Sequence, residues 1–199
     1  MNPISFRRAL LGASVVAGAG LLASAGAARA ASTSPREQVR QRRLPNVPLV
    51  DQNGRTVRFY DDLVRDQQVL INVMYTVCSN ICTPATRNLM DARARLAEHL
   101  PDLRFISISL TPLTDTPAEL RAYKAQFGID DRWTFLTGES RHVDQVTRAL
   151  GLQSDNPNDD LLSHSGSAVI GDERHVKWGH ANAMSSGRGI ARMVRFELS

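Results

Sequence analysis

The alternation of predicted strands with predicted helices constrains the fold of this 199-residue chain more than any other feature. From Val47 onwards, short apolar runs with strand character are separated by segments whose apolar residues recur at helical spacing. The predicted strands span 68–76, 103–110, 132–138, 165–171 and 175–179, and the predicted helices span 84–100, 116–128, 140–151 and 188–196. Such alternation needs crossover connections, so helices cover both faces of a central mixed sheet. The sequence predicts an α/β fold.

Local signals place the ends of several elements. Asn53-Gly54 lies between two alternating runs in "VPLVDQNGRTVRFYDDLV", which predicts an N-terminal β-hairpin. The helix over 116–128 has Thr116 as its expected N-cap, Pro117 and Glu119 in its first turn, and Gly128 at its end. The helix over 140–151 is expected to begin with Ser140 as its cap and to end at Gly151.

The only two cysteines, Cys78 and Cys82, lie between the strand over 68–76 and the helix that comes after it. Four interpretations are open: a structural disulfide, a redox-active pair, two metal ligands, or two buried residues without a role. Thioredoxin-like folds place their chemistry at this junction, where the backbone N–H groups of a helix N-terminus favour an anionic thiolate. The position therefore favours a functional pair in a thioredoxin-like fold.

The spacing of the cysteines also suits a metal. Residues at i and i+4 share a helix face, so both sulfurs can converge on one ion, and two thiolates with one imidazole suit a soft ion such as Cu(I). His164 directly precedes a predicted buried strand and is the candidate expected at the same edge of the sheet. The other histidines are expected at the remote end of the first helix, on a surface helix, or in solvent beside the last hairpin: His99, His142, His175 and His180.

The N-terminal residues 1–30 resemble an export signal. Arg7-Arg8 precedes a run rich in Gly and Ala, and Ala28-Arg29-Ala30 has the small-x-small pattern of a cleavage site. The arginine pair resembles a twin-arginine signal, which predicts a periplasmic protein; an uncleaved membrane anchor is the alternative. Residues 31–45 are basic and predict a flexible tether, and 46–199 form the predicted domain.

Charge argues against a nucleic-acid partner. The formal net charge is +4, but Arg7, Arg8 and Arg29 belong to the predicted signal, which holds no acidic residue. The rest of the chain is almost neutral, and binding to a polyanion is not expected. The basic tether leaves some proximity to a membrane surface open.

Three motifs, in their order and separation, resemble the SCO/SenC family of copper chaperones for cytochrome c oxidase assembly. They are "VMYTVCSNICTPATRNLM", "FISISLTPLTDTPAELRAYKAQFG" and "LLSHSGSAVIGDERHVKW". The resemblance extends over nearly all of the chain from Leu44. It implies a thioredoxin-like fold and copper ligands at Cys78, Cys82 and His164, and it aligns Asp115-Thr116-Pro117 with the family's Asp-Thr-Pro. Ser79 and Thr83 stand where that family usually has proline.

The resemblance implies a metallochaperone that holds Cu(I) or Cu(II) and passes it to a client such as cytochrome c oxidase subunit II. A copper donor or a thiol reductant is a possible further partner. The alternative is a thiol-disulfide oxidoreductase in which Cys78 attacks and Cys82 resolves, a chemistry that needs no histidine. Asp115 is expected to cap its helix, or else to form a hydrogen bond near the site.

Overall fold

The computed structural model describes residues 34, 36–38, 44–77, 81–153 and 166–199. All of them belong to one compact unit, Thr33–Ser199. The predicted export signal and the site residues Cys78 and His164 lie outside the described residues.

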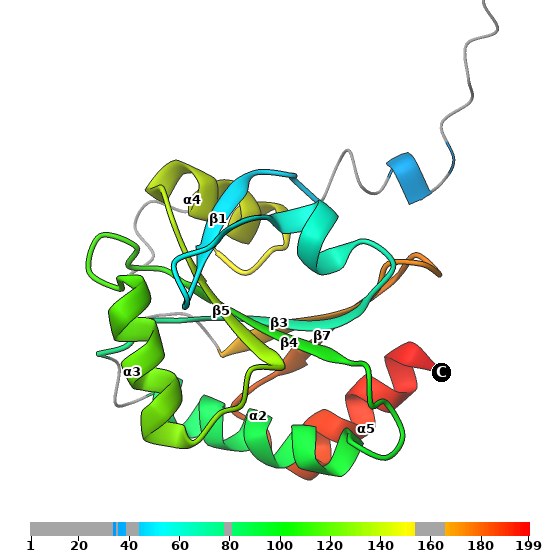
Figure 1. Ribbon diagram of the computed structural model, residues 1–199. Helices are drawn as coiled ribbons and strands as arrows, with labels where there is room; N and C mark the ends of the chain where they lie inside the picture. Colours follow the sequence, from blue (N-terminus) through cyan, green and yellow to red (C-terminus); the bar gives the residue numbers. More distant parts are fainter. Residues whose placement is uncertain (1–33, 35, 39–43, 78–80, 154–165) are drawn as a thin grey trace, which may run out of the picture. The chain divides into compact units, whose positions relative to one another are not determined.

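A seven-stranded mixed sheet runs through the unit, with the strand order β2-β1-β5-β4-β3-β6-β7 (Figure 1). The central strands β3, β4 and β5 are parallel, whereas β1 and β6 join them antiparallel on either side. The strands are β1 Pro48–Asp51, β2 Thr56–Arg58, β3 Gln68–Met74, β4 Arg104–Ser109, β5 Trp133–Thr137, β6 Ser167–Asp172 and β7 Lys177–Asn182. The predicted α/β fold with an N-terminal hairpin and a central mixed sheet is confirmed.

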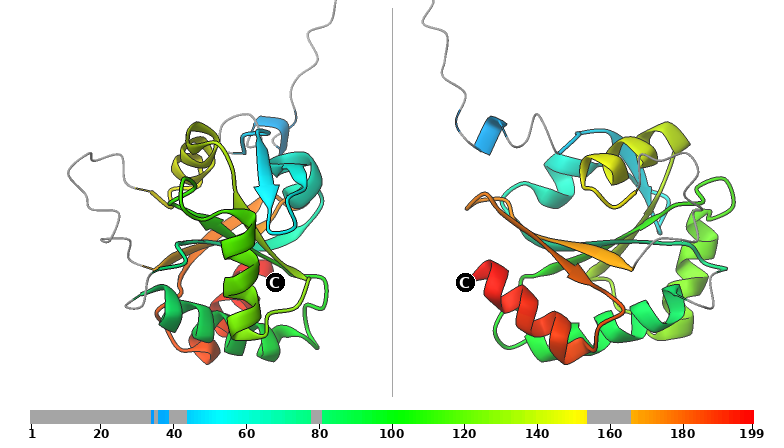
Figure 2. Two further views of the ribbon diagram at one scale, coloured as in Figure 1. Left: turned by 60° about the vertical axis from the view of Figure 1, so that its left-hand side comes forward. Right: turned by 180° about the vertical axis from the view of Figure 1, so that it is seen from behind.

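Helices cover both faces of the sheet, as Figures 1 and 2 show. The helices are α2 Cys82–Leu96, α3 Pro117–Phe127, α4 Ser140–Ala149 and α5 Gly187–Leu198, together with the π-helix η1 Phe59–Val64. Side chains alternate across β3, so that Leu70 packs toward α2, α3 and α5, whereas Val69 and Ile71 pack toward η1 and α4.

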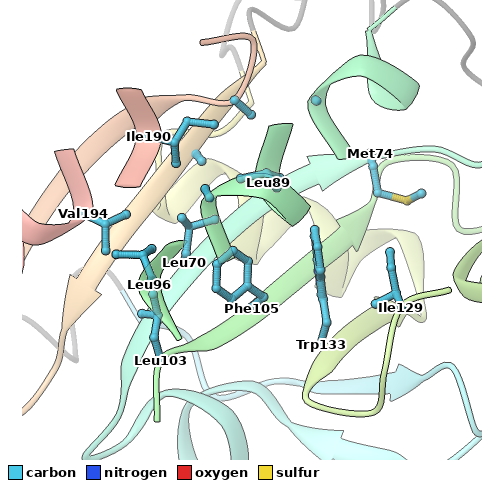
Figure 3. Close-up of a cluster of buried hydrophobic side chains, with 14 of the residues drawn as sticks. Leu70, Met74, Leu89, Leu96, Leu103, Phe105, Ile129, Trp133, Ile190 and Val194 are labelled. Carbon is cyan, nitrogen blue, oxygen red and sulfur yellow. The ribbon is translucent and has the colours of Figure 1, made fainter. Parts of the chain in front are cut away.

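The larger of the two apolar clusters lies beneath α2 and α5 (Figure 3). Its aromatic centre is Phe105 on β4 against Trp133 on β5, with ring centroids 5.1 Å apart. Leu89 of α2 and Ile190 of α5 close over it, both almost completely buried. This packing anchors α2 on the sheet and so fixes where its first residue, Cys82, lies.

Several predicted boundaries were wrong or incomplete; the strand predicted over 68–76 ends at Met74, and the strand predicted over 175–179 spans Lys177–Asn182. The second alternating run is a strand only as far as Arg58, because Phe59–Val64 form a π-helix that buries four apolar or aromatic side chains. Helix α2 ends at Leu96 rather than at residue 100. Ser140 does not cap α4: Glu139 is the N-cap residue and gives no side-chain hydrogen bond. Within the described residues, no helix has the length and apolar character required to cross a membrane.

Candidate metal centre

Helix α2 begins at Cys82, at the edge of the sheet where the parallel strands β3 and β4 end. The Cys82 side chain is 6% exposed and belongs to the apolar cluster beneath α2. The first turn of this helix contains no acidic residue, so its N–H groups meet no competing carboxylate there. The N–H groups of a helix N-terminus stabilise an anionic sulfur, whereas burial in the apolar cluster acts against the anion.

A small cavity of about 20 Å³ borders Cys82, with room for about one water molecule. The lining residues come from the end of β3, the start of α2, the start of β6, and the residues that follow β4 and β7. They are Asn72, Val73, Met74, Tyr75, Ile81, Cys82, Ala85, Leu110, Gly166, Ser167 and Ala183. The start of β6 therefore lies beside the start of α2. This is the neighbourhood that the sequence predicted for His164, because Gly166 is the first described residue after it.

Gly166 adopts a left-handed backbone conformation at the entry to β6, with φ of 66°. A Cβ at this position would lie 2.7 Å from Cγ of Met184, so a side chain there would require Met184 to shift. Both observations favour glycine, which allows the chain to turn into β6 close to the cavity.

Tyr123 of α3 supports the first turn of α2 from below. Its hydroxyl group lies 2.8 Å from Oγ1 of Thr86 and donates to the carbonyl oxygen of Cys82 at 3.4 Å. The tyrosine is 4% exposed, so these bonds form away from water. Helix α3 therefore helps to fix the backbone of Cys82.

Asp115 is only 1% exposed, and it lies beneath the loop that leads from β3 to the cysteines. Its carboxylate accepts hydrogen bonds from Oγ1 of Thr76 at 2.6 Å and from the Thr76 amide at 3.2 Å. It also accepts from the hydroxyl groups of Ser109 at 2.6 Å and Thr111 at 3.0 Å. We call these four residues the Asp115 clasp; it joins the end of β3 to the end of β4.

The expectation that Asp115 caps α3 was wrong. Thr116 is the N-cap residue, and its Oγ1 accepts a hydrogen bond from the amide of Glu119 at 3.3 Å. Asp115 makes the hydrogen bond near the site that was the other expectation. Because Thr76 precedes Cys78 by two residues, the clasp fixes the chain just before the first cysteine.

None of the four described histidines is among the residues that line the cavity. His99 lies just after the end of α2, His142 is half-buried on α4, and His180 is exposed on β7. His175 is 63% exposed, and its Nδ1 lies 2.9 Å from the carboxylate of Asp172. In the part of the chain that the structure describes, no group of three or more His, Cys, Asp or Glu side chains could hold a metal ion. The ligand set Cys78, Cys82 and His164 stays a prediction, with Cys82 placed.

A second buried carboxylate, missed by the sequence analysis, lies at the opposite ends of the strands. Glu173, 2% exposed, accepts from Nε of Arg36 at 2.7 Å, from the Tyr60 hydroxyl at 2.8 Å and from the Asp66 amide at 2.8 Å. We call this set the Glu173 clamp. Burial acts to raise the pKa of Glu173, but the bonds from Arg36, Asp66 and Tyr60 outweigh it and hold the pKa below its ordinary value.

Comparison with known proteins identifies the family. The sequence pattern of the SCO1/SenC family matches residues 37–195, most of the chain. A protein of Stutzerimonas stutzeri that is named for copper binding is 27% identical over 161 residues, covering 78% of this chain and 76% of that protein.

Solved structures agree on the fold. ScoI of Bradyrhizobium japonicum, solved with copper bound, superposes with a TM-score of 0.59 at 20% identity, covering 77% of this chain and 99% of that one. BsSco, described as a member of the Sco family of cytochrome c oxidase assembly proteins with a disulfide switch, gives 0.61 at 22% identity, covering 75% and 89%. The predicted thioredoxin-like architecture is confirmed by these likenesses. The match over residues 37–195 shows that the chain belongs to the SCO1/SenC family.

Proposed function

We propose that this protein is an exported copper chaperone that holds one copper ion through Cys78, Cys82 and His164 and delivers it to an oxidase-type copper site. Membership of the SCO1/SenC family supports the proposal. So do the relative named for copper binding and the copper-bound structure of a family member.

The observation that carries the proposal is the shared cavity of Cys82 and Gly166. His164 precedes Gly166 by two residues, and two residues of chain span at most about 7 Å. Cys78 directly follows Val77 and precedes Ile81, another residue of the cavity lining, by three. Covalent connection alone therefore limits all three proposed ligands to the surroundings of one small cavity.

The donor set suits copper as a cargo. Two thiolates and an imidazole are soft and borderline ligands that bind Cu(I), and the imidazole also suits Cu(II). A site of three ligands can admit a fourth from an incoming acceptor, so copper can pass by stepwise exchange to cysteine and histidine side chains. The acceptor that we propose is the binuclear copper site of cytochrome c oxidase subunit II.

The Asp115 clasp acts as a positioning device in this proposal. It fixes Thr76, while Tyr123 fixes the carbonyl of Cys82, so the chain is held on both sides of Cys78. The clasp contains no cation, since its described donors are hydroxyl and amide groups. Its negative charge therefore also favours a cation bound nearby.

Export completes the proposal. We propose that residues 1–30 direct the chain to the periplasm by a twin-arginine route, that 31–45 form a tether, and that 46–199 are the copper-binding domain. In an oxidising compartment Cys78 and Cys82 need a reductant before they can bind copper. A thiol reductant and a copper donor are therefore expected partners.

The test is an anaerobic titration of the reduced protein with Cu(I), in competition with a chromogenic chelator. The wild type is expected to bind one equivalent tightly, and His164→Ala, Cys78→Ser and Cys82→Ser are expected to lose tight binding. His180→Ala is the matched control, because this exposed histidine on β7 lies outside the cavity lining. Full binding by His164→Ala, or no tight binding by the wild type, contradicts the proposal.

A second candidate function, thiol-disulfide exchange with a client, is favoured by the contrast between the two ends of the cysteine loop. Val77, beside Cys78, is 83% exposed, whereas Cys82 is 6% exposed. An attacking thiol needs access and a resolving thiol does not. The Cys78 thiolate would attack a client disulfide and release one client thiolate; Cys82 would then attack the sulfur of Cys78 and release the second. Two electrons pass to the client, and Cys78 and Cys82 become a disulfide.

The histidine separates the two functions. Reduction of a disulfide-bonded client peptide by His164→Ala at the wild-type rate, together with absent copper binding by the wild type, would favour exchange. Tight copper binding that depends on His164 favours the chaperone.

A further inference from the structure

The outer face of α5 carries arginines together with exposed apolar side chains. Its inner side is buried through Ile190, Ala191 and Val194. Its outer side exposes Met193, at 41%, and Phe196, at 74%. Three arginines, spaced i, i+4 and i+7, project from the same outer side: Arg188, Arg192 and Arg195. We call these five exposed residues the α5 outer face; α5 is the red helix beside α2 in Figure 1.

The arginines of this face keep their positive charge uncompensated by ion pairs with described residues. None of the three arginines forms an ion pair with any residue that the structure describes. A hollow of about 520 Å³ lies along the face, lined by Arg95, Arg188, Ala191, Arg192, Arg195, Phe196 and Ser199. Arg95 is paired with Asp91, and the three arginines of α5 give the open hollow guanidinium groups that suit anionic oxygen atoms, which arginine binds with two parallel hydrogen bonds.

The acidic groups near the hollow offset only part of its positive charge, because Asp91 pairs with Arg95 and not with the arginines of α5. Asp91 accepts from Nε of Arg95 at 3.0 Å. The carboxylate of Glu197 lies over Gly179 on β7. The carbonyl oxygen of Ser199 accepts a hydrogen bond from Nζ of Lys177. The face therefore presents a net positive surface.

We propose that the α5 outer face docks on a membrane surface rich in anionic phospholipids. The arginines complement the phosphate groups, and each basic residue near such a surface strengthens attachment. Phe196 and Met193 favour a lipid surface over an acidic protein segment, because apolar side chains between the arginines gain from contact with the acyl boundary. This proposal does not depend on copper binding.

Docking in this way leaves the candidate metal centre accessible. Arg95 lies thirteen residues after Cys82 on the same helix, a separation of about 20 Å along the axis. The proposed membrane contact therefore lies near the C-terminal end of α2, and the candidate metal centre lies at its N-terminal end. The docked protein would keep its candidate metal centre free for a client in the same membrane.

The test is co-sedimentation of the protein, as expressing cells process it, with vesicles of phosphatidylcholine alone or with 30% phosphatidylglycerol. The wild type is expected to bind the anionic vesicles at least tenfold more strongly, with binding that weakens as salt rises. The double variant Arg188→Glu with Arg195→Glu is expected to lose tenfold or more of that binding. Phe196→Ser is expected to lose severalfold, most clearly at high salt where charge is screened.

The matched control is Arg132→Glu with Arg141→Glu, which makes the same change of net charge on other surfaces at arginines that are 72% and 75% exposed. It is expected to bind within twofold of the wild type. All variants carry the same N-terminal residues, so any contribution of the tether cancels. Circular dichroism spectra and unfolding midpoints establish that each variant is folded.

Two outcomes would overturn the proposal. The first is equal binding of the wild type to the two kinds of vesicle, or equal losses in the α5 variant and its control. The second is retention on immobilised polyglutamate, dependent on the α5 arginines, without binding to anionic vesicles; that result assigns the face to an acidic protein partner.

Discussion

Two buried carboxylates, Asp115 and Glu173, lie at opposite ends of the central strands, and their hydrogen-bond partners differ in charge. Asp115, at the carboxyl ends of β3 and β4, accepts hydrogen bonds from hydroxyl and amide groups among the described residues. Glu173, beyond the last residue of β6 at the other edge, is paired with the guanidinium group of Arg36. Among the described residues no cationic side chain pairs with Asp115, whereas Arg36 compensates the charge of Glu173. We infer that the first carboxylate positions a cation site and the second stabilises the fold.

The largest expected effect comes from the removal of Glu173. Glu173→Ala leaves the Tyr60 hydroxyl and the Asp66 amide without their buried acceptor, and we expect a loss of about 3 kcal/mol in the free energy of unfolding. Urea denaturation measures this loss. Copper stoichiometry should remain that of the wild type, and a parallel loss of copper binding in the folded variant would show that the two edges do not act separately.

Asp115→Asn tests whether the carboxylate at the candidate metal centre contributes to copper binding. The amide side chain keeps the size of the carboxylate but loses its charge and part of its acceptor capacity, so we expect about 2 kcal/mol of lost stability. We also expect Cu(I) affinity to fall about tenfold, because Thr76 is released and the negative charge is gone. Competition with a chelator measures the affinity. Glu173→Gln is the control, and an equal fall in that variant would remove the distinction.

The pH dependence of stability isolates the charge of Glu173. Its pKa in the folded protein is held below the ordinary value of 4.5, so its contribution is present above pH 4.5 and is lost as the pH falls toward the folded pKa. Unfolding measured between pH 7 and pH 3 should show this decline, reduced in Glu173→Gln by about 1 kcal/mol over the range. Identical slopes in the variant and the wild type would mean that other carboxylates account for the whole decline.

Arg36→Gln is expected to have the smallest effect. Its side chain is 36% exposed, and solvent screening limits the pair to about 1 kcal/mol or less. Tyr60→Phe, which removes a buried donor to the same carboxylate, provides a comparison of similar size. A loss from Arg36→Gln as large as that from Glu173→Ala would mean that the cation, rather than the hydrogen-bond network, carries the clamp.

Local sequence signals predicted the fold well where one short segment determines the structure. Thr116, Pro117, Glu119 and Gly128 begin and end α3 as expected, because capping depends on residues within one turn. The Asn53-Gly54 hairpin was predicted for the same reason, since Gly54 adopts the positive φ that its turn requires.

Interactions between distant residues could not be predicted from those signals. Arg36 and Glu173 are 137 residues apart, and nothing in either segment indicates the other. Asp115 is of a residue type that often caps helices and stands just before the start of α3. Its carboxylate instead accepts hydrogen bonds from Thr76 and Ser109, which no local sequence signal connects with it. Of the candidate site, the position of Cys82 at the strand-to-helix junction was predicted. Cys82 and Gly166 line the same cavity because β6 pairs with β3, and this pairing joins segments that are far apart in the sequence.

That pairing has a consequence for the order of events during folding. Asn72 on β3 faces Ala168 on β6 across the sheet, so the cavity beside Cys82 is complete only after strands from the two halves of the chain have joined. Contacts of such long sequence separation form late and close a large loop. The cavity beside Cys82 is therefore absent from a nascent chain in which β6 has not yet paired with β3. Capture of a cargo ion there would report that the whole sheet has assembled.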